Sequence, residues 1–247
     1  YVSPKMLKLP KIHKKLRKAY KKGYVPVIPA ISDDNPYLAK VIDDVIVTYA
    51  DRPLILLKTS LTWSVGRSQE KGTQLWLLES SFDPYAKCIT IEVEAELMRD
   101  YKTQNVIGYV EGTMFPDSVV IICGHYDHLG KMGEAIFYGA NDNASGIALM
   151  LDIASFFVEN PQKYTIAFIA FGAEEAGLVG SQYYVQHPLF PLQKTKFVFN
   201  MDLMGSGDGG ATIVNATVFP AEFAVLKKIN DENQYLPKIK ARGKAAN

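Results

Sequence analysis

One histidine-containing segment and several acidic residues follow successive predicted strands. The residues whose side chains could do chemistry are His125, Asp127, Asp142, Glu174, Glu175 and Asp202. The apolar runs 119–123, 164–171 and 196–200 are predicted strands, and they immediately precede three of the four segments that carry these residues. Because the carboxyl ends of strands line the ligand crevice of open α/β sheets, we expect these side chains to converge.

One imidazole with three or four carboxylates is a donor set that suits a pair of zinc ions. Zinc binds histidine nitrogen and carboxylate oxygen, and a catalytic site keeps one position open for water. A carboxylate can bridge two ions that are about 3.5–4 Å apart. A further carboxylate that is not a ligand can accept a proton from the water. Glu174 and Glu175 suit this division, because neighbouring side chains at a strand end point in different directions.

Each of these motifs also has an ordinary structural interpretation when it is taken alone. His125 could be a hydrogen-bonded residue at a strand end, and two adjacent glutamates are usually solvated surface. Asp142 would most often be a helix N-cap, and Asp202 a turn residue. Their joint placement after successive strands is much harder to obtain by chance, and it favours a metal site.

The elements that must position these residues alternate between strand and helix from residue 105 onward. Further strands are predicted at 106–109 and 211–215, and helices at 144–158, from 181, and at 220–233. This order predicts an α/β fold with a doubly wound, mostly parallel sheet flanked by helices.

Residues 1–95 have a different character, which predicts a separate small β-rich module with one helix. Ile12, Leu16 and Tyr20 recur every four residues and indicate an amphipathic helix. Strand-like segments are expected at 25–28, 52–58, 75–78 and 87–97.

The first 32 residues contain nine Lys or Arg and no acidic residue. This excess could form an arm for nucleic acid or anionic lipid. We favour a solvated helix face that is balanced by Asp33, Asp34, Asp43 and Asp44, because the basic patch is short and lacks interleaved aromatic residues.

Four segments in this order resemble metallopeptidase family 28, which includes bacterial leucyl aminopeptidases, aminopeptidase Y, glutamate carboxypeptidase and glutaminyl cyclase. The segments are His125-Tyr-Asp127-His128-Leu-Gly130, Gly139-Ala-Asn-Asp142-Asn-Ala-Ser-Gly146, Phe171-Gly-Ala-Glu174-Glu175-Ala-Gly-Leu-Val-Gly-Ser181 and Asn200-Met-Asp202. The resemblance implies that residues 96–247 form a zinc peptidase domain with the zinc exopeptidase fold. More loosely, residues 1–95 look like the protease-associated type of insert found in some of these enzymes.

The resemblance also implies roles for individual residues. It places His125 and Asp202 on one zinc, Glu175 on the other, and Asp142 between the two ions. It makes Glu174 the general base and Asp127 the partner that holds the His125 ring. It further implies a cis peptide bond between Asp142 and Asn143.

One expected ligand has no match in this sequence. The resemblance implies a histidine for the Glu175 zinc, in a Ser-Asp-His segment near the C-terminus. The chain contains only His13, His125, His128 and His187. We therefore expect the sequence to be a fragment or truncated, with two zinc ions in the complete protein and an incomplete second site in residues 1–247.

These observations lead to a functional hypothesis. The chain is expected to be a two-zinc aminopeptidase that removes N-terminal residues from peptides, through a metal-bridging water activated by Glu174. The alternatives are a glutaminyl cyclase-like acyltransferase with one zinc, and a non-catalytic binding domain on the same fold. Carboxypeptidase-like action also stays open, as do side-chain preference and oligomeric state.

The overall composition agrees with a globular enzyme that acts on peptides. Hydrophobic residues make up 48% and charged residues 21%, and the net charge of +1 gives no pull toward nucleic acid. No apolar run reaches the length of about 18 residues that a membrane span needs. Two cysteines, Cys88 and Cys123, exclude a disulfide framework. The run Gly205–Gly210 fits a dinucleotide-binding pattern, but we expect a turn because a strand follows it.

Overall fold

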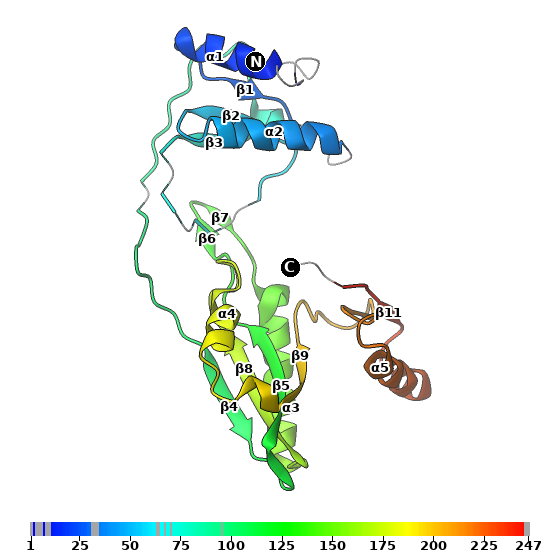
Figure 1. Ribbon diagram of the computed structural model, residues 1–247. Coiled ribbons are helices and arrows are strands. Elements are labelled where there is room, and N and C mark those ends of the chain that lie inside the picture. Colours follow the sequence, from blue (N-terminus) through cyan, green and yellow to red (C-terminus); the bar gives the residue numbers. More distant parts are fainter. Residues whose placement is uncertain are drawn as a thin grey trace. The chain divides into compact units, whose positions relative to one another are not determined.

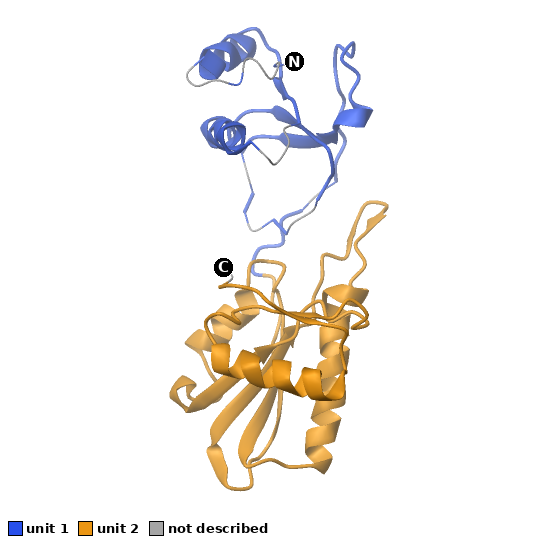
Figure 2. Cartoon of the chain, turned by 90° about the vertical axis from the view of Figure 1, so that its right-hand side faces the viewer, with its two compact units in different colours: residues 1–100 blue, residues 101–247 orange. Residues whose placement is uncertain are grey.

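The computed structural model describes residues 2, 7, 11–30, 35–62, 65–66, 68–69, 71–94 and 96–244. The chain divides into two compact units, residues 1–100 and residues 101–247 (Figure 2). In the described residues no helix combines the length and the apolar character that crossing a membrane requires.

The first unit combines a small parallel sheet with two helices. Its elements are α1 (Lys11–Lys21), β1 (Val27–Ile28), α2 (Pro36–Thr48), β2 (Leu54–Lys58) and β3 (Gln74–Leu78) (Figure 1). The three strands are parallel in the order β1-β2-β3. Ile12 and Leu16 of α1 are fully buried with Val41 and Val45 of α2. The apolar stripe predicted on the first helix therefore faces the core of this unit, with its lysines outside.

The expectation of one helix in the first module was wrong, because its described residues form two α-helices. In the described part of this unit, α1 and α2 have 11 and 13 residues, whereas the three strands have 2, 5 and 5. The second helix, α2, begins at Asn35-Pro36, a pair of residues that is also common in turns. The Asn35 side chain accepts a hydrogen bond from the Leu38 backbone N–H at 3.1 Å, and Pro36 occupies the first turn. Both features are typical of a helix N-terminus.

The strand predicted at 87–97 is absent from the described residues of that segment. Ile89, Ile91 and Val93 alternate with polar residues, but their side chains are 48%, 43% and 75% exposed. Strand alternation is stable only where a neighbouring strand supplies hydrogen bonds and a buried face, and this segment has neither. Of the acidic residues expected to balance the basic helix, Asp44 bonds to His13 at 2.8 Å, whereas Asp33 and Asp34 lie outside the described residues.

The second unit is built on a four-stranded sheet in the order β4-β8-β5-β9 (Figure 1). Its strands are β4 (Val106–Val110), β5 (Phe115–His125), β8 (Tyr164–Phe171) and β9 (Thr195–Asn200). β5 runs parallel to β8 and β9 on its two sides, and β4 is antiparallel to β8. The carboxyl ends of the three parallel strands therefore lie at one edge of the sheet.

Helices pack on both faces of this sheet. Ile122 and Phe168 form a buried cluster with Met150 of α3 (Ser145–Glu159). On the other face, Ile121 and Ala167 are buried with Tyr184 of α4 (Val179–Gln186). Both β5 and β8 therefore have buried residues on their two faces, which agrees with their continuous hydrophobic runs.

The remaining elements of the second unit are short strands, two short helical turns and one longer helix. They are the β6–β7 hairpin (Lys131–Met132 and Ala135–Ile136), η3 (Ala140–Ala144), η4 (Leu192–Lys194), β10 (Ala211–Ile213), α5 (Pro220–Asn233) and β11 (Ile239–Ala241). β10 and β11 form a separate parallel pair, and β11 was not predicted. Gly205, Gly207 and Gly210 have positive φ angles just before β10, so the glycine-rich run is a turn, as expected.

Candidate metal centre

The strand order brings the predicted motifs together at one edge of the sheet. His125 is the last residue of β5, the central strand of the parallel part. Glu174 and Glu175 follow β8 on one side of β5, and Asp202 follows β9 on the other. The loop that carries Asp142 runs directly into α3, which packs on β5 (Figure 1). The carboxyl ends of parallel strands are the usual place for a ligand site in such sheets.

The first group of possible metal ligands consists of His125, Asp142 and Asp202. The His125 Nε2 atom lies 3.1 Å from Asp142 Oδ1 and 3.4 Å from Asp202 Oδ1. Two ligands of a tetrahedral zinc, each about 2.0–2.2 Å from the ion, are about 3.3–3.5 Å apart. The spacing of these atoms fits a shared ion.

A second group consists of His128, Asp142 and Glu175, and it shares Asp142 with the first. The His128 Nδ1 atom lies 2.8 Å from Glu175 Oε1. Within the described residues, Glu174 is a member of neither group. It instead lines a cavity of about 600 Å³ together with His125 and Asp202.

Asp127 contacts the site differently from the arrangement that the resemblance implied. The Nδ1 atom of His125 bonds to the backbone carbonyl oxygen of Asp127 at 3.0 Å, whereas the Asp127 carboxylate is 3.8 Å away. A carbonyl oxygen can only accept, so Nδ1 carries the proton. In the neutral ring, Nε2 then keeps its lone pair on the side of Asp142 and Asp202.

The carboxylate of Asp127 binds the backbone of the two glutamates. Its two oxygens accept hydrogen bonds from the N–H groups of Glu174 at 3.0 Å and Glu175 at 3.2 Å. Asp127 thus links the histidine segment after β5 to the glutamate segment after β8.

Asn143 is a positioning residue whose side-chain role was not predicted from the sequence. Its side chain is 2% exposed, and Nδ2 donates to the Met201 carbonyl oxygen at 2.9 Å. Its Oδ1 atom accepts from the N–H groups of Gly146 at 3.2 Å and Leu203 at 3.3 Å. The Asn143 amide therefore fixes the Asp142 loop against the segment that carries Asp202. The peptide bond between Asp142 and Asn143 is cis, as the resemblance implied.

The electrostatics of the site raise two pKa values. Burial would lower the pKa of His125, but the Asp127 carbonyl and the charges of Glu174, Asp202 and Asp142 outweigh burial and raise it above its usual value. Burial also raises the pKa of Glu174, and the neighbouring carboxylates add to this rise against the opposing effect of His125. Concentrated negative charge of this kind is what bound cations would neutralise.

The donor set agrees with zinc as the resident metal. Imidazole nitrogen together with carboxylate oxygen is a zinc-type combination. The His128 Nδ1 atom is inaccessible to solvent and has no hydrogen-bond partner in the described residues, although a carboxylate oxygen faces it. A buried polar atom without a partner is rare in folded proteins, and a cation bound between the two groups would account for it.

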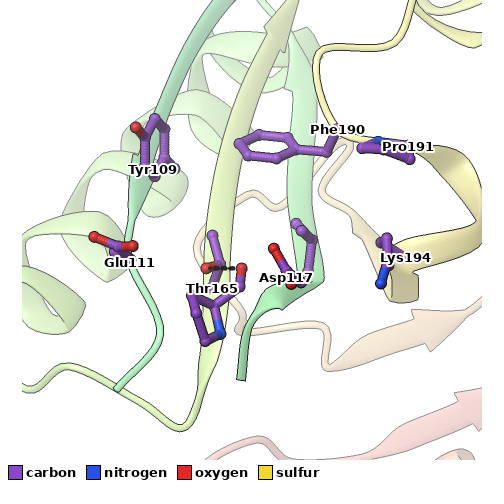
Figure 3. A pocket seen from close by; sticks show the side chains of 9 residues that line it. Tyr109, Glu111, Asp117, Thr165, Phe190, Pro191 and Lys194 are labelled. Atoms are coloured by element: carbon purple, nitrogen blue, oxygen red, sulfur yellow. Dashed lines mark hydrogen bonds between the residues drawn. The ribbon is translucent and has the colours of Figure 1, made fainter. Parts of the chain in front are cut away.

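A second cavity, of about 310 Å³, lies at the opposite end of the sheet (Figure 3). Val119 and Thr165, which line it, are paired in β5 and β8 six residues before His125 and Phe171. The buried Thr165 hydroxyl is used within the fold, since it donates to the Pro116 carbonyl oxygen at 2.7 Å. This cavity holds none of the residues predicted for the site.

Comparison with known sequences identifies relatives among zinc peptidases. Residues 105–239 match Peptidase family M28, which is more than half of the chain. An aminopeptidase of Bacillus subtilis, YwaD, is 39% identical over 107 residues, which cover 42% of this chain and 22% of the relative. A "Probable zinc metalloprotease" of Pyricularia oryzae is 28% identical over 195 residues, which cover 73% of this chain and 38% of the relative. The chain therefore spans well under half the length of these relatives.

The mixed α/β fold is also that of a solved zinc exopeptidase. A zinc aminopeptidase from Bacillus subtilis aligns with a TM-score of 0.57 and 20% identity, over 89% of this chain and 54% of that one. At this identity the likeness concerns the fold alone. The family match over residues 105–239 includes all four motifs, and it shows that this chain belongs to peptidase family M28.

Proposed function

We propose that the protein is a two-zinc exopeptidase of the aminopeptidase type. His125 and Asp202 hold one ion, Glu175 holds the other, and Asp142 bridges them. Glu174 acts as the general base. The substrate class is a peptide with a free N-terminus, which is the class of activity that the name of the Bacillus subtilis relative states for that protein.

The observation that carries this proposal is the position of Asp142. Its carboxylate belongs to both groups of possible ligands, one built around His125 and the other around Glu175. A carboxylate with two oxygens can contact two ions that are about 3.5–4 Å apart, which is the spacing of co-catalytic metal pairs. The membership of Glu174 in the lining of the adjacent cavity, but in neither ligand group, supports its role as a base.

A bound zinc pair supplies acidification of water and polarisation of the scissile carbonyl. Glu174 accepts a proton from the attacking water on its carboxylate and then delivers it to the departing amine nitrogen. Asp127 holds the Glu174 and Glu175 backbone so that both carboxylates keep their direction. The raised pKa of Glu174 suits a group that must both take and return a proton.

Selection of a free N-terminus would take place at the metal pair. Asp142 and Asp202 have partly exposed side chains, at 37% and 44%, so ions held by them would be open to a substrate. An unblocked amine has a nitrogen lone pair that a zinc ion can accept, whereas the nitrogen of an acylated amine does not offer one. The proposal therefore predicts a strong preference for unblocked substrates.

The decisive experiment measures zinc content and hydrolysis together on the full chain. Amino-acid anilides with free and acetylated amines are compared for the wild type and for Glu174→Gln. We expect Glu174→Gln to lower kcat by about 10²–10⁴-fold, the usual contribution of a general base, with zinc content unchanged. Loss of zinc together with activity would show instead that Glu174 is a ligand.

A substrate with an N-terminal glutamine, added to the same experiment, separates the alternative functions. A cyclase-like acyltransferase would bind one zinc per chain and convert a substrate with N-terminal glutamine without cleaving anilides. A non-catalytic binding domain would turn over neither substrate. Both outcomes would reject the exopeptidase proposal.

Two structural proposals accompany the functional one. The sheet of residues 101–247, with helices on both faces, supports a doubly wound core of the zinc exopeptidase type. For residues 1–95 we keep the role of a protease-associated type of module. Its removal is expected to change KM for peptides more than for small anilides.

A further inference from the structure

Helix α1 and the residue that follows it carry a surface with positive charge alone. Seven Lys or Arg side chains are exposed there, and the helix contains no acidic residue. At about 100° per residue, these side chains cover roughly 160° of the helix surface, on the side opposite the buried Ile12 and Leu16. This basic face consists of Lys11, Lys14, Lys15, Arg17, Lys18, Lys21 and Lys22.

The charge of the basic face is not balanced by ion pairs. In the described residues, none of its seven side chains forms a salt bridge. Asp44, which was expected to help balance it, instead bonds to His13 at 2.8 Å. Seven like charges along about 18 Å of helix repel one another, and a negatively charged partner would relieve that repulsion.

Another helix of the chain shows the ordinary arrangement of a solvated face. In α5, Lys227 lies 2.7 Å from Asp231, four residues further along the helix. Lys228 lies 3.8 Å from Glu232 at the same spacing. Such pairs mix both signs of charge on one helix surface. The basic face of α1 has a single sign, so it differs from a surface that only has to face water.

The residue types of the basic face favour a lipid surface over a nucleic acid. Six of the seven are lysines, which act as flexible point charges, whereas recognition of nucleic acids prefers the planar fork of arginine. The face also includes no aromatic side chain on which a base could stack. Clusters of about four to eight lysines or arginines on an amphipathic helix are typical of binding to anionic lipids.

An exposed aromatic residue is held at the end of the basic face. The Tyr24 N–H donates to the Ala19 carbonyl oxygen at 3.1 Å, and Gly23 makes the turn with a φ angle of 76°. The Tyr24 side chain is nonetheless 65% exposed, and that of Val25 is 40% exposed. Tyrosine is a residue type that is enriched at the level of lipid head groups.

We propose that the basic face of α1 is a docking surface for a membrane that carries anionic lipids. Its ammonium groups contact the phosphate and carboxylate groups of the lipid heads, and Tyr24 lies at the level of those heads. The helix does not insert, because Ile12 and Leu16 on its apolar side are buried in the core of the first unit. This docking goes beyond the proposed peptidase function and uses no residue of the metal centre.

The test sediments the full chain with vesicles of phosphatidylcholine, with and without phosphatidylserine. The first variant has glutamine, whose helix propensity is similar to that of lysine, in place of Lys14, Lys15, Lys18 and Lys22. A second variant has arginine at the same four positions, which keeps the charge. The matched control has glutamine at four exposed lysines of the second unit, Lys163, Lys227, Lys228 and Lys240.

We expect the wild type to bind only the vesicles that contain phosphatidylserine. A salt concentration of about 1 M, which shortens the screening length to about 3 Å, should release it. The glutamine variant of α1 should bind about 100-fold more weakly, because four charges near the anionic surface are lost. The arginine variant and the matched control should bind like the wild type, and Tyr24→Ser should weaken binding by a smaller factor.

Several outcomes would overturn this inference. A wild type that does not bind the anionic vesicles is one, and a glutamine variant of α1 that binds as tightly as the wild type is another. An equal loss in the matched control would show that net charge matters and the basic face does not. Tighter binding to a DNA duplex or to polyglutamate than to the vesicles would reject the lipid partner.

The same samples keep this inference distinct from the proposed function. Zinc content and anilide hydrolysis are measured beside vesicle binding, and the glutamine variant of α1 should retain both. Vesicle binding by a wild type that cleaves no substrate would reject the peptidase proposal and leave the docking surface standing. Circular dichroism checks the folding of each variant, and the double variant Lys14→Gln/Lys18→Gln repeats the test if the fourfold variant is unfolded.

Discussion

A carboxylate that accepts hydrogen bonds from two successive backbone N–H groups contributes more to a site than its own charge, because it also fixes the backbone of both residues. The Asp127 carboxylate binds the N–H groups of Glu174 and Glu175, the proposed base and a proposed ligand. Its backbone carbonyl meanwhile sets which nitrogen of His125 carries the proton. One residue therefore orients a base, a carboxylate ligand and an imidazole.

Removal of the Asp127 carboxylate should weaken both catalysis and metal binding. Without its acceptors, the N–H groups of Glu174 and Glu175 lose their fixed partners and the two side chains lose direction. We expect Asp127→Ala to lower kcat/KM and zinc affinity by about 10–100-fold, the usual effect of residues that orient metal ligands. Steady-state kinetics and zinc titration check this. Asp117→Ala, in the cavity at the opposite end of the sheet, should change neither.

The two cysteines should differ sharply in reactivity. Cys88 is exposed, whereas Cys123 is buried in β5, and burial raises the pKa of its thiol to about 12. At pH 8 only about one in 10⁴ Cys123 thiols would be ionised, and the thiolate is the reactive form. We expect iodoacetamide to label Cys88 alone in the native protein and both cysteines in urea, as counted by mass spectrometry. Rapid native labelling of Cys123 in Cys88→Ser would contradict its burial.

Single residues differed in how far their roles could be predicted. The sequence motifs predicted His125, Asp142, Glu174 and Asp202 as site residues, because each follows a strand or opens a helix. Nothing in the sequence separated Asn143 from any loop asparagine, since its role depends on atoms of Met201 and Leu203 far along the chain.

At the scale of elements, the start of α3 is held very close to the end of β9. Asn143 bonds to both segments, and Ser145 Oγ accepts the N–H groups of Met204 at 3.0 Å and Gly205 at 3.3 Å. This junction keeps Asp142 and Asp202 beside the same atom of the His125 ring, Nε2.

A side chain at Gly146 should force this junction apart. An added Cβ atom would lie 2.5 Å from the Met201 carbonyl oxygen and against the Asn143 side chain. Alanine otherwise favours a helix, so any loss of stability reflects the missing space. We expect Gly146→Ala to destabilise the fold by about 1–3 kcal/mol and to weaken zinc binding.

Urea unfolding with and without a chelator measures both effects of Gly146→Ala. Gly209→Ala is the matched control, because no atom lies within 4 Å of its added Cβ. Equal stability of the two variants would show that the junction can yield without cost.

Elements were predicted well where burial and periodicity agree. The predicted bounds of β8 and α5 are those of the structure, since a strand buried on two faces and a helix that begins at proline both have strong local signals. Residues 87–97 have a strand-like pattern but no partner strand among the described residues. The helix α2 was not predicted, because it begins with residues that are also common in turns. The strand with which a segment pairs lies elsewhere in the chain, so a local sequence pattern cannot identify it.

At the scale of the whole molecule, the chain consists of two compact units. A short 3-10 helix, Glu79–Ser81, follows β3. Between this helix and β4 the described residues form no helix or strand, and most of their side chains are exposed. Lys87, Arg99 and Lys102 lie in this segment. Exposed chain without regular structure is the usual site of proteolytic cleavage.

Limited trypsin digestion should therefore cut first between residues 87 and 102. The expected products are two fragments that correspond to the compact units, identified by mass spectrometry. Replacing Lys87, Arg99 and Lys102 by glutamine should slow this cleavage without changing zinc content. First cuts between residues 105 and 200 would contradict the division into units.

The sequence by itself determined which donors are available. Their identity, their order along the chain and their positions after strands are local properties, and they were enough to favour a metal site, to which the family resemblance added the expectation of a zinc peptidase. The tertiary structure decided which donors meet. Because β5 lies between β8 and β9, the loop after it places His125 beside Asp202 and His128 beside Glu175. That pairing depends on strand order and register. Both bring together residues that are far apart in the chain, so neither can be predicted from the sequence of a single segment.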